Sequence, residues 1–370
     1  MPIAHPPELL RLRQTLDRID NHLLDLIGER QQTIAAIGEI KRGMGKPLRD
    51  FAREKEVLAL ASAHADARGL DRSLAHELMK LLIQHSLTTQ EHEQIRAEAL
   101  GDGRRALVVG GGGQMGRWFA RFLDSQGYTV ELCDPALETG AAGVAEFAQR
   151  RRLDDGALDQ DLILIAAGIE ASVGVMHALA TRQPAGVVID VASIKAPLAT
   201  GYQALQQAGV AVASLHPMFG PGAVLLADRH VVVIDLGSAR ATALAHSLFA
   251  ATTATVVAMN LPDHDRLMAE VLGLSHAVNI VFAAALASGG ADERRLDGIS
   301  SATFNAQTKV TRAVVNENPK LYFEIQSLNP NSAEVLARLG QALDELRAAL
   351  ATGDLARFAA LMQAGKQQLG

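Results

Sequence analysis

The sequence predicts a multidomain protein with an all-helical N-terminal part, a doubly wound parallel sheet in the middle and a helical C-terminal part. Three observations support this fold class. Apolar residues recur at helical spacing through residues 8–99, short apolar runs alternate with helical segments from residue 105, and no strand pattern follows Met259. A chain of 370 residues has room for two or three domains of about 100–200 residues each. We therefore place the domains at residues 1–100, 104–258 and 259–370.

The N-terminal part is predicted to form three helices, over residues 8–42, 50–68 and 71–99. Asp50 is a suitable N-cap for the second helix, since its side chain accepts from backbone N–H groups of the first turn. The glycines in 101–103 indicate a linker to the next domain.

The middle part is predicted to contain buried parallel strands, because its apolar runs are short and continuous. These runs cover residues 106–109, 128–133, 162–166, 187–191, 210–214 and 231–234. The C-terminal part is rich in alanine, and we expect its helices to break at Ser288–Gly290, near Pro319 and Pro330, and at Gly353.

A glycine-rich turn, Gly110 to Gly116, joins the first strand of the middle part to a helix. Such a turn lets the backbone approach a pyrophosphate at the helix N-terminus, as in Rossmann-like domains. Asp134 ends the second strand, at the position where dinucleotide-binding domains carry an acidic residue that binds the adenosine ribose. No arginine directly follows Asp134 to bind a 2′-phosphate. We therefore expect NAD to bind at Gly111, Gly113, Gln114, Met115, Gly116 and Asp134. The alternative is a flavodoxin-like turn that binds no dinucleotide.

The composition narrows the remaining choices. The formal net charge is −6, which gives no basic field for nucleic acid. Cys133 is the single cysteine, so a disulfide within the chain is excluded and a reducing, cytoplasmic location fits. The first residues lack a basic segment followed by an apolar run, and no uninterrupted apolar stretch of about 20 residues occurs. We expect no signal peptide, membrane span or metal site.

Several cationic and polar residues of the N-terminal part share helix faces. Arg30 and Lys41 project within about 20° of each other at about 100° per residue. Ser86 and Gln90 share a face at i, i+4, so these four side chains can converge on one small anion. Arg13 lies about 25 Å from Arg30 along a straight helix, too far for one small ligand. A contribution from Arg13 therefore requires a second, antiparallel copy of the chain.

Residues 8–95 carry a set of spaced motifs: Leu12-Arg13, Asp17-x-x-Asp20-x-x-Leu23-Leu24, Arg30, Gly38-x-x-Lys41, Pro47-x-x-Asp50-x-x-Arg53-Glu54 and Ser86-x-x-x-Gln90. This set resembles the chorismate mutases of the all-helical, intertwined-dimer family. The resemblance implies that Arg13 of a second copy, Arg30 and Arg53 hold the carboxylate and hydroxyl groups of chorismate. It also implies that Lys41 and Gln90 contact the ether oxygen, that Asp50 and Glu54 position the ring hydroxyl, and that Ser86 supports a carboxylate.

Two segments of the middle part follow predicted strands, where ligands bind in such sheets. They are Asp190-Val-Ala-Ser193-Ile-Lys195 and Leu215-His216-Pro-Met-Phe-Gly-Pro221. A proline-flanked histidine at this edge is held rigidly, and beside a nicotinamide we favour catalysis over a purely structural role.

With the glycine turn and Asp263-His264-Asp265, these segments resemble the prephenate dehydrogenases, and the order of the two parts is similar to that of the bifunctional T-proteins of tyrosine synthesis. The resemblance implies that His216 binds the ring hydroxyl of prephenate, that Ser193 orients His216, and that Lys195 lies near the same pocket. His264, Asp265 and His276 would line its helical wall. The family also makes tyrosine the expected feedback inhibitor.

The C-terminal part departs from the family pattern. An arginine is expected six residues before Pro319, where this chain has Ala313, with Arg312 beside it. An upstream arginine is replaced by Asn305, and Ala166-Ala-Gly168 stands where a proline is usual. Arg312, Lys309, Arg294 and Arg295 are the candidates for holding the substrate carboxylate. The anchor, and the choice between prephenate and arogenate, stay open at this point.

Two other hypotheses remain. One is a dehydrogenase of the 3-hydroxyacid or 6-phosphogluconate kind, which does not explain the N-terminal part or the segment around His216. The other makes the N-terminal part a dimerisation or effector-binding module without catalysis. The clustered cations argue against that module, since dimer interfaces avoid unpaired buried charge.

Overall fold

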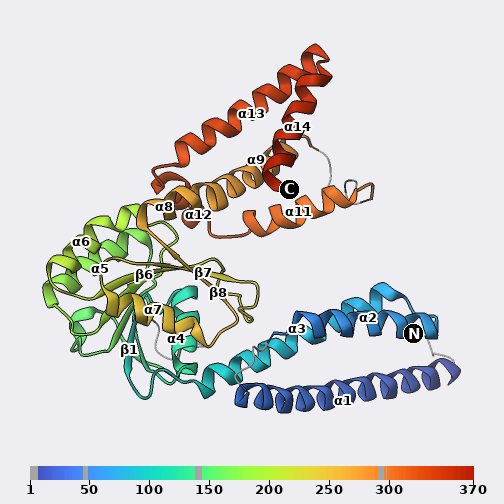
Figure 1. Ribbon diagram of the computed structural model, residues 1–370, viewed down its shortest axis with the longest axis horizontal. Helices are drawn as coiled ribbons and strands as arrows, with labels where there is room; N and C mark the ends of the chain where they lie inside the picture. Colours follow the sequence, from blue (N-terminus) through green and yellow to red (C-terminus); the bar gives the residue numbers. More distant parts are fainter. Residues whose placement is uncertain (1–6, 45–48, 138–143, 291–295, 297) are drawn as a thin grey trace, which may run out of the picture.

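The computed structural model describes residues 7–44, 49–137, 144–290, 296 and 298–370, and the statements below refer to these residues. Three helices at the N-terminus and a group of helices at the C-terminus project from a central sheet domain as separate arms (Figure 1). The fold class expected from the sequence is thereby confirmed, with helical parts on either side of a mostly parallel sheet in chain order.

The N-terminal arm consists of α1 (Pro7–Gly43), α2 (Phe51–Arg68) and α3 (Arg72–Ala97). Asp50 caps α2 by accepting from the backbone N–H of Arg53 at 3.0 Å, as expected, and Asp71 caps α3 in the same way. Within the described residues, α3 contacts both of the other helices, and Gly38 is the one buried residue of α1. The long apolar face of α1 is therefore exposed in a single chain.

The central sheet has eight strands in the order β3-β2-β1-β4-β5-β6-β7-β8. Their bounds are β1 (Arg105–Val109), β2 (Thr129–Cys133), β3 (Ala148–Arg150), β4 (Leu162–Ile165), β5 (Val187–Asp190), β6 (Val212–Pro217), β7 (His230–Ile234) and β8 (Thr255–Met259). The strands pair in parallel except that β7 runs antiparallel to β6. The carboxyl ends of β1, β4, β5 and β6 consequently meet at one edge of the sheet.

Three sequence expectations about this sheet were wrong. Strand β7 is antiparallel, although its continuous apolar run suits a parallel strand equally well. The edge strands β3 and β8 were missed, because β3 is three residues long and polar, and no residue of β8 is fully buried. Strand β6 continues to Pro217, so His216 is a strand residue rather than a loop residue.

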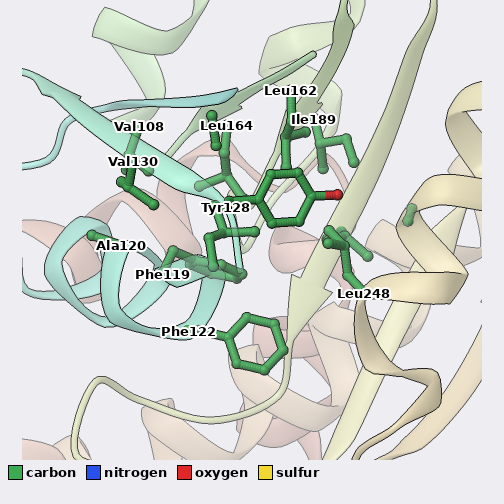
Figure 2. Packing of buried hydrophobic residues seen from close by; sticks show 14 of the residues in the cluster. Val108, Phe119, Ala120, Phe122, Tyr128, Val130, Leu162, Leu164, Ile189 and Leu248 are labelled. Atoms are coloured by element: carbon green, nitrogen blue, oxygen red, sulfur yellow. The ribbon is translucent and has the colours of Figure 1, made fainter. Parts of the chain in front are cut away.

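Helices cover both faces of the sheet: α4 (Gln114–Ser125) and α7 (Ala239–Ala250) on one, α5 (Ile169–Arg182) and α6 (Ala199–Gln207) on the other. Short 3₁₀ turns occur at Leu153–Asp155 and Ala196–Leu198. Successive strand residues point to opposite faces, so Val108 packs toward α4 and α7, and Leu107 toward α5 and α6. Figure 2 shows Val108, Phe119, Phe122 and Leu248 on the first face. Both faces are sealed, and the carboxyl edge is left for ligands.

The C-terminal arm begins with a continuous helical stretch, α8 (Leu261–Met268), a π-helical turn η3 (Ala269–Leu274) and α9 (Ser275–Ser288). The remaining helices are α11 (Ala302–Val315), α12 (Pro319–Leu328), α13 (Ser332–Thr352) and α14 (Leu355–Leu369). The expected helix breaks at Ser288–Gly290, Pro319, Pro330 and Gly353 are confirmed.

The stretch Leu261–Ser288 is long and apolar enough, by length and composition alone, to cross a membrane. Its most apolar window has a mean hydropathy of 1.8, and 17% of that window is buried within the chain. The sequence expectation of no such stretch depended on an uninterrupted apolar run, whereas a window average tolerates polar residues within the stretch. The N-terminal end of this helix is nonetheless packed on the sheet domain, where His264 is fully buried.

Candidate active sites

The N-terminal arm contains a cavity of about 760 Å³ between its helices. Seven of the eight residues expected in a site there line this cavity: Arg30, Lys41, Asp50, Arg53, Glu54, Ser86 and Gln90. Three elements supply them, since α1 carries two, α2 and its cap carry three, and α3 carries two. The helical-face argument from the sequence thus brought together residues up to sixty positions apart.

Three hydrogen bonds from two side chains fix the inner wall of this cavity. Arg30 donates to the Ser86 hydroxyl at 2.5 Å and to the Leu82 carbonyl at 3.1 Å. Gln90 donates through Nε2 to the Ile34 carbonyl at 3.0 Å. A Cβ on Gly38 would lie 3.4 Å from the Gln90 side chain, so α1 and α3 pack closely here. Burial lowers the pKa of Arg30 from its usual range, but a guanidinium remains charged at neutral pH.

Arg13 is the one expected residue outside this cavity. It is exposed on the N-terminal half of α1, among exposed apolar residues that include Leu12, Leu16 and Ile19. A single chain therefore does not bring Arg13 to Arg30, as the helix length had indicated.

The glycine-rich turn forms a tight cradle at the carboxyl end of β1. Gly110 has φ 84° and a Cβ there would overlap Ala166, while a Cβ on Gly116 would lie 2.1 Å from the Gly110 carbonyl oxygen. Gly113 is the N-cap of α4 and supplies no capping side chain, so the first N–H groups of the helix are open to an anion. Gln114 and Met115 form its first turn. This close backbone geometry fits a dinucleotide pyrophosphate.

Asp134 lies beside this cradle, immediately after β2. Its carboxylate accepts from the backbone N–H of Gly112 at 3.1 Å and of Ala136 at 2.8 Å. It is thereby aimed at the glycine turn, where an adenosine ribose would lie. Burial raises the pKa of the neighbouring Cys133 thiol to about 11, so this cysteine is an inert core residue.

His216 lies near the carboxyl end of β6 and is almost fully buried. Its Nδ1 is 2.8 Å from Nε2 of His264, and His264 Nδ1 is 2.7 Å from an oxygen of Asp265. The Asp265 carboxylate also accepts from the backbone N–H groups of Lys195 and Ala196 at 2.9 and 2.6 Å. Burial lowers the pKa of both histidines, and the positive charge of Lys195 lowers that of His216 further.

A second buried network lies below His216. The Lys195 ammonium is fully enclosed and donates to Asp190 at 2.9 Å and to the Leu215 carbonyl at 2.7 Å. The Tyr202 hydroxyl donates to the other Asp190 oxygen at 2.8 Å. Leu215 directly precedes His216, so Lys195 fixes the backbone that carries the histidine. Its ammonium acts through that backbone, and we no longer expect it to contact a ligand.

Comparison with known proteins follows the same division. A family model for "Chorismate mutase type II" matches residues 12–91. The models for the nucleotide-binding domain and the dimerization domain of prephenate dehydrogenase match residues 119–258 and 261–364. A 4-amino-4-deoxyprephenate dehydrogenase of Streptomyces pristinaespiralis is 30% identical over 280 residues, covering 72% of this chain and 91% of the relative.

The chain belongs to the prephenate dehydrogenase family, preceded by a type II chorismate mutase domain. A T-protein of Enterobacter agglomerans is 27% identical over 365 residues and covers 98% of this chain and 93% of its own length, which confirms the resemblance to the T-proteins. Among solved structures, the A. aeolicus prephenate dehydrogenase in complex with hydroxyphenyl propionate and NAD⁺ covers 72% of this chain and 98% of its own, with a TM-score of 0.56 at 16% identity.

Two expectations about the dehydrogenase site change. Among the described residues, the hydrogen-bond partner of His216 is His264, and Ser193 makes no hydrogen bond to it. His264 is fully enclosed and therefore contacts His216 instead of lining a wall for substrate. The sequence carried a signal for this, since Asp263-His264-Asp265 was singled out, but periodicity does not show which neighbour a histidine contacts.

Two of the four C-terminal candidates for a carboxylate anchor lie within the described residues. Arg312 and Lys309 are exposed on α11, whereas the adjacent Thr311 is buried and hydrogen-bonded to Asn279. Arg294 and Arg295 lie outside the described residues. His276 stacks on Tyr322 with ring centroids 4.1 Å apart, and burial lowers the pKa of His276.

Proposed function

We propose that this chain catalyses two consecutive steps of tyrosine biosynthesis. The N-terminal domain converts chorismate to prephenate, and the remainder oxidatively decarboxylates prephenate to 4-hydroxyphenylpyruvate with NAD. The observation that carries this proposal is the presence, in one chain of the family, of a cation-lined cavity in the mutase domain and a histidine at the carboxyl edge of a dinucleotide-binding sheet.

The mutase cavity suits a reaction that needs no proton transfer. Chorismate rearranges in an intramolecular pericyclic step, so the protein helps by holding the folded dianion and by stabilising charge on the breaking ether bond. Arg30 and Arg53 are placed to bind carboxylate and hydroxyl groups, with Ser86 behind Arg30. Lys41 and Gln90 address the ether oxygen, and a lysine suits it as a compact point charge. Asp50 and Glu54 position the ring hydroxyl.

The dehydrogenase residues fit NAD because the glycine cradle admits no side chain and Asp134 faces the same turn. When bound there, the cofactor supplies the acceptor for a hydride. Gly111, Gly113, Gln114, Met115 and Gly116 would hold its pyrophosphate. Asp134 would accept from the ribose, which favours NAD over NADP.

His216 is proposed as the general base of the dehydrogenase. Its buried imidazole is neutral, because desolvation disfavours the charged form, and a neutral imidazole accepts the proton of the substrate hydroxyl. Hydride leaves the carbon that bears this hydroxyl, and loss of carbon dioxide gives the aromatic ring. Ser193, half-buried after β5, remains a candidate substrate contact, and Arg312 remains a candidate for the substrate carboxylate.

We also propose that the protein is a homodimer in the cytoplasm. Exposed apolar residues lie along the length of α1. Others lie on the C-terminal helices, for example Val278 and Val281 on α9. Large exposed apolar faces favour association, and the family model that matches the C-terminal helices is that of a dimerization domain. A second copy covering α9 also accounts for the apolar stretch Leu261–Ser288 without a membrane.

A single assay tests both activities. Purified protein receives chorismate and NAD, and chorismate loss and NADH formation are followed together. We expect chorismate loss to precede NADH, and added prephenate to give NADH at once. NADH from prephenate without chorismate loss would remove the mutase. Arogenate and prephenate supplied in competition identify the preferred substrate, and we expect prephenate.

A further inference from the structure

We propose that His264 and Asp265 are positioning residues for the dehydrogenation, which hold His216 in the tautomer whose Nε2 lone pair faces the substrate hydroxyl. This inference rests on the proposed dehydrogenase function. It starts from a line of three side chains: His216 on β6, then His264 and Asp265 on α8, joined by contacts of 2.8 and 2.7 Å. All three are buried.

The position of the proton on each histidine ring can be deduced from the charge of Asp265. Hydrogen bonds from His264 and from the Lys195 and Ala196 N–H groups lower the pKa of Asp265, although burial opposes this. An ionised carboxylate only accepts, so His264 must carry its proton on Nδ1. Burial keeps His264 neutral, which leaves a lone pair on its Nε2. His216 therefore donates from Nδ1 to His264, and its own Nε2 is unprotonated. Among the described residues, this Nε2 makes no hydrogen bond.

The charge of the surrounding network suits proton acceptance. Asp190 and Asp265 contribute two negative charges and Lys195 one positive charge, so the network carries one net negative charge while both histidines are neutral. A proton taken by His216 brings this total to zero. In a low-dielectric interior such neutralisation is favoured over the creation of a new net charge. The backbone N–H bonds from Lys195 and Ala196 hold Asp265 in place while this happens.

The resulting step balances. The substrate O–H bond breaks and its proton moves to His216 Nε2. A nicotinamide bound at the glycine turn would supply the acceptor for the hydride of the same carbon. The electron pair of the breaking carbon–carboxylate bond enters the ring as carbon dioxide departs. The phenolic oxygen then recovers a proton from His216. Asp265 keeps its negative charge throughout and stabilises the transient imidazolium through His264.

The first test compares Asp265→Asn with Asp263→Asn, a partly exposed aspartate two residues away on the same helix. An asparagine can donate to His264 and permits the opposite tautomer. We expect kcat with prephenate to fall about 10²–10⁴-fold in Asp265→Asn, with KM within about 3-fold, and little change in the control. Mutase activity of the same preparation reports folding. An unchanged kcat in a folded Asp265→Asn variant would overturn the proposal.

The second test reads the tautomer directly. Nitrogen-15 NMR of the His216 ring in the full-length protein is expected to show a protonated Nδ1 and an unprotonated Nε2, and a protonated Nε2 in Asp265→Asn. The opposite assignment in the unaltered protein contradicts the proposal. This measurement does not require turnover. Failure of the proposed function, seen as no NADH from prephenate in the unaltered protein, is therefore distinguished from failure of the tautomer assignment.

A third test uses two substitutions of His264. A glutamine can accept the Nδ1 proton of His216 through its side-chain oxygen, whereas a leucine of similar bulk cannot. We expect His264→Gln to retain at least about 10-fold more kcat than His264→Leu. Equal loss in the two variants would show that His264 merely fills space, and would overturn its positioning role.

The pH profile supplies the last readout. The charged and titratable groups facing His216 are His264 and Asp265 from α8, and Lys195 and Asp190 from β5 and the turn after it. Because burial lowers the pKa of His216, the acid limb of kcat/KM should lie below about pH 6.5. Neutralising Asp265 removes a charge that favours protonation, so the limb should move to still lower pH in Asp265→Asn. A shift to higher pH contradicts this.

Discussion

The mutase cavity and the dehydrogenase site use charge in opposite ways. The cavity of the N-terminal arm is wide and lined by fixed cations, and Arg53 has a side chain that is 60% exposed and paired with Glu56. At the dehydrogenase site the ionisable groups are enclosed, and His216 and His264 are held neutral by burial. A pericyclic rearrangement needs only fixed charge, whereas an oxidation with proton removal needs a group that changes its charge.

The two sites also differ in how much of them one chain supplies. Strands β5 and β6, the turn after β5, and α8 bring the buried dehydrogenase residues together within a single chain. The mutase cavity lacks Arg13, and the apolar face of α1 around Arg13 is uncovered. The buried site is thus formed within one chain, whereas the open one is proposed to be completed by a second copy.

Substitution of Lys41 should affect the mutase activity strongly and leave the dehydrogenase activity unchanged. Lys41→Ala removes the point charge proposed to stabilise the ether oxygen, and should lower mutase kcat by about 10²–10³-fold or more. NADH formation from added prephenate should be unchanged. Lys55→Ala on α2, an exposed lysine outside the cavity, is the control and should leave both rates intact. Normal mutase turnover in Lys41→Ala would refute the proposed role.

The proposed dimer predicts complementation between two impaired variants. Arg13→Ala and Arg30→Ala should each lower mutase activity by about 10–10²-fold. Mixed dimers contain one site with both arginines and one with neither, if Arg13 acts in the site of the other copy. After random exchange, about a quarter of the unaltered activity should return, measured as chorismate loss. No recovery in dimers verified by mass would mean that Arg13 does not act in the site of the other copy.

The one part of the dehydrogenase site that folding leaves open is the carboxylate anchor. If Arg312 binds the substrate carboxylate, Arg312→Ala should raise KM for prephenate about 10-fold, with a smaller change in kcat. Lys309→Ala, exposed on the same helix, is the matched control. An unchanged KM in Arg312→Ala removes it as the anchor, and a raised KM in the control alone would transfer the role to Lys309.

Much of this molecule could be predicted from sequence because the features are local or periodic. Helix caps such as Asp50, the glycine turn and the cluster around Arg30 follow from spacing along one or two helices. The tight glycine turn before α4 and the cation-lined cavity were both found where expected.

The parts that could not be predicted depend on long-range contacts. His264 meets His216 from a helix 48 residues away, and Lys195 turns inward to Asp190 and the Leu215 carbonyl instead of toward a ligand. The apolar periods of strands (two residues) and helices (3.6 residues) show which face of an element is buried. They do not show which polar side chain of another element a buried residue contacts. For the same reason the role of Glu91, which lies on a polar stretch of α3, could not be predicted.

Glu91, on α3 of the mutase arm, contacts the sheet domain. Its substitution should have a smaller effect than the substitutions of Lys41, Arg13, Arg30 and Arg312. Its carboxylate is buried and accepts from the Leu226 N–H at 2.9 Å and from the N–H and hydroxyl of Thr253. Glu91→Gln replaces one acceptor oxygen by a donor, which leaves a buried N–H group without a partner and should cost about 1–3 kcal/mol. We expect a lower unfolding midpoint in urea with both activities retained, and no change in Glu98→Gln at the exposed end of α3.

An unchanged midpoint in Glu91→Gln would mean that this contact does not hold the mutase arm to the sheet domain. Because Gln90 lines the mutase cavity and Glu91 binds the chain after β6, a loss of mutase activity would instead reveal that the open site depends on its attachment to the buried one.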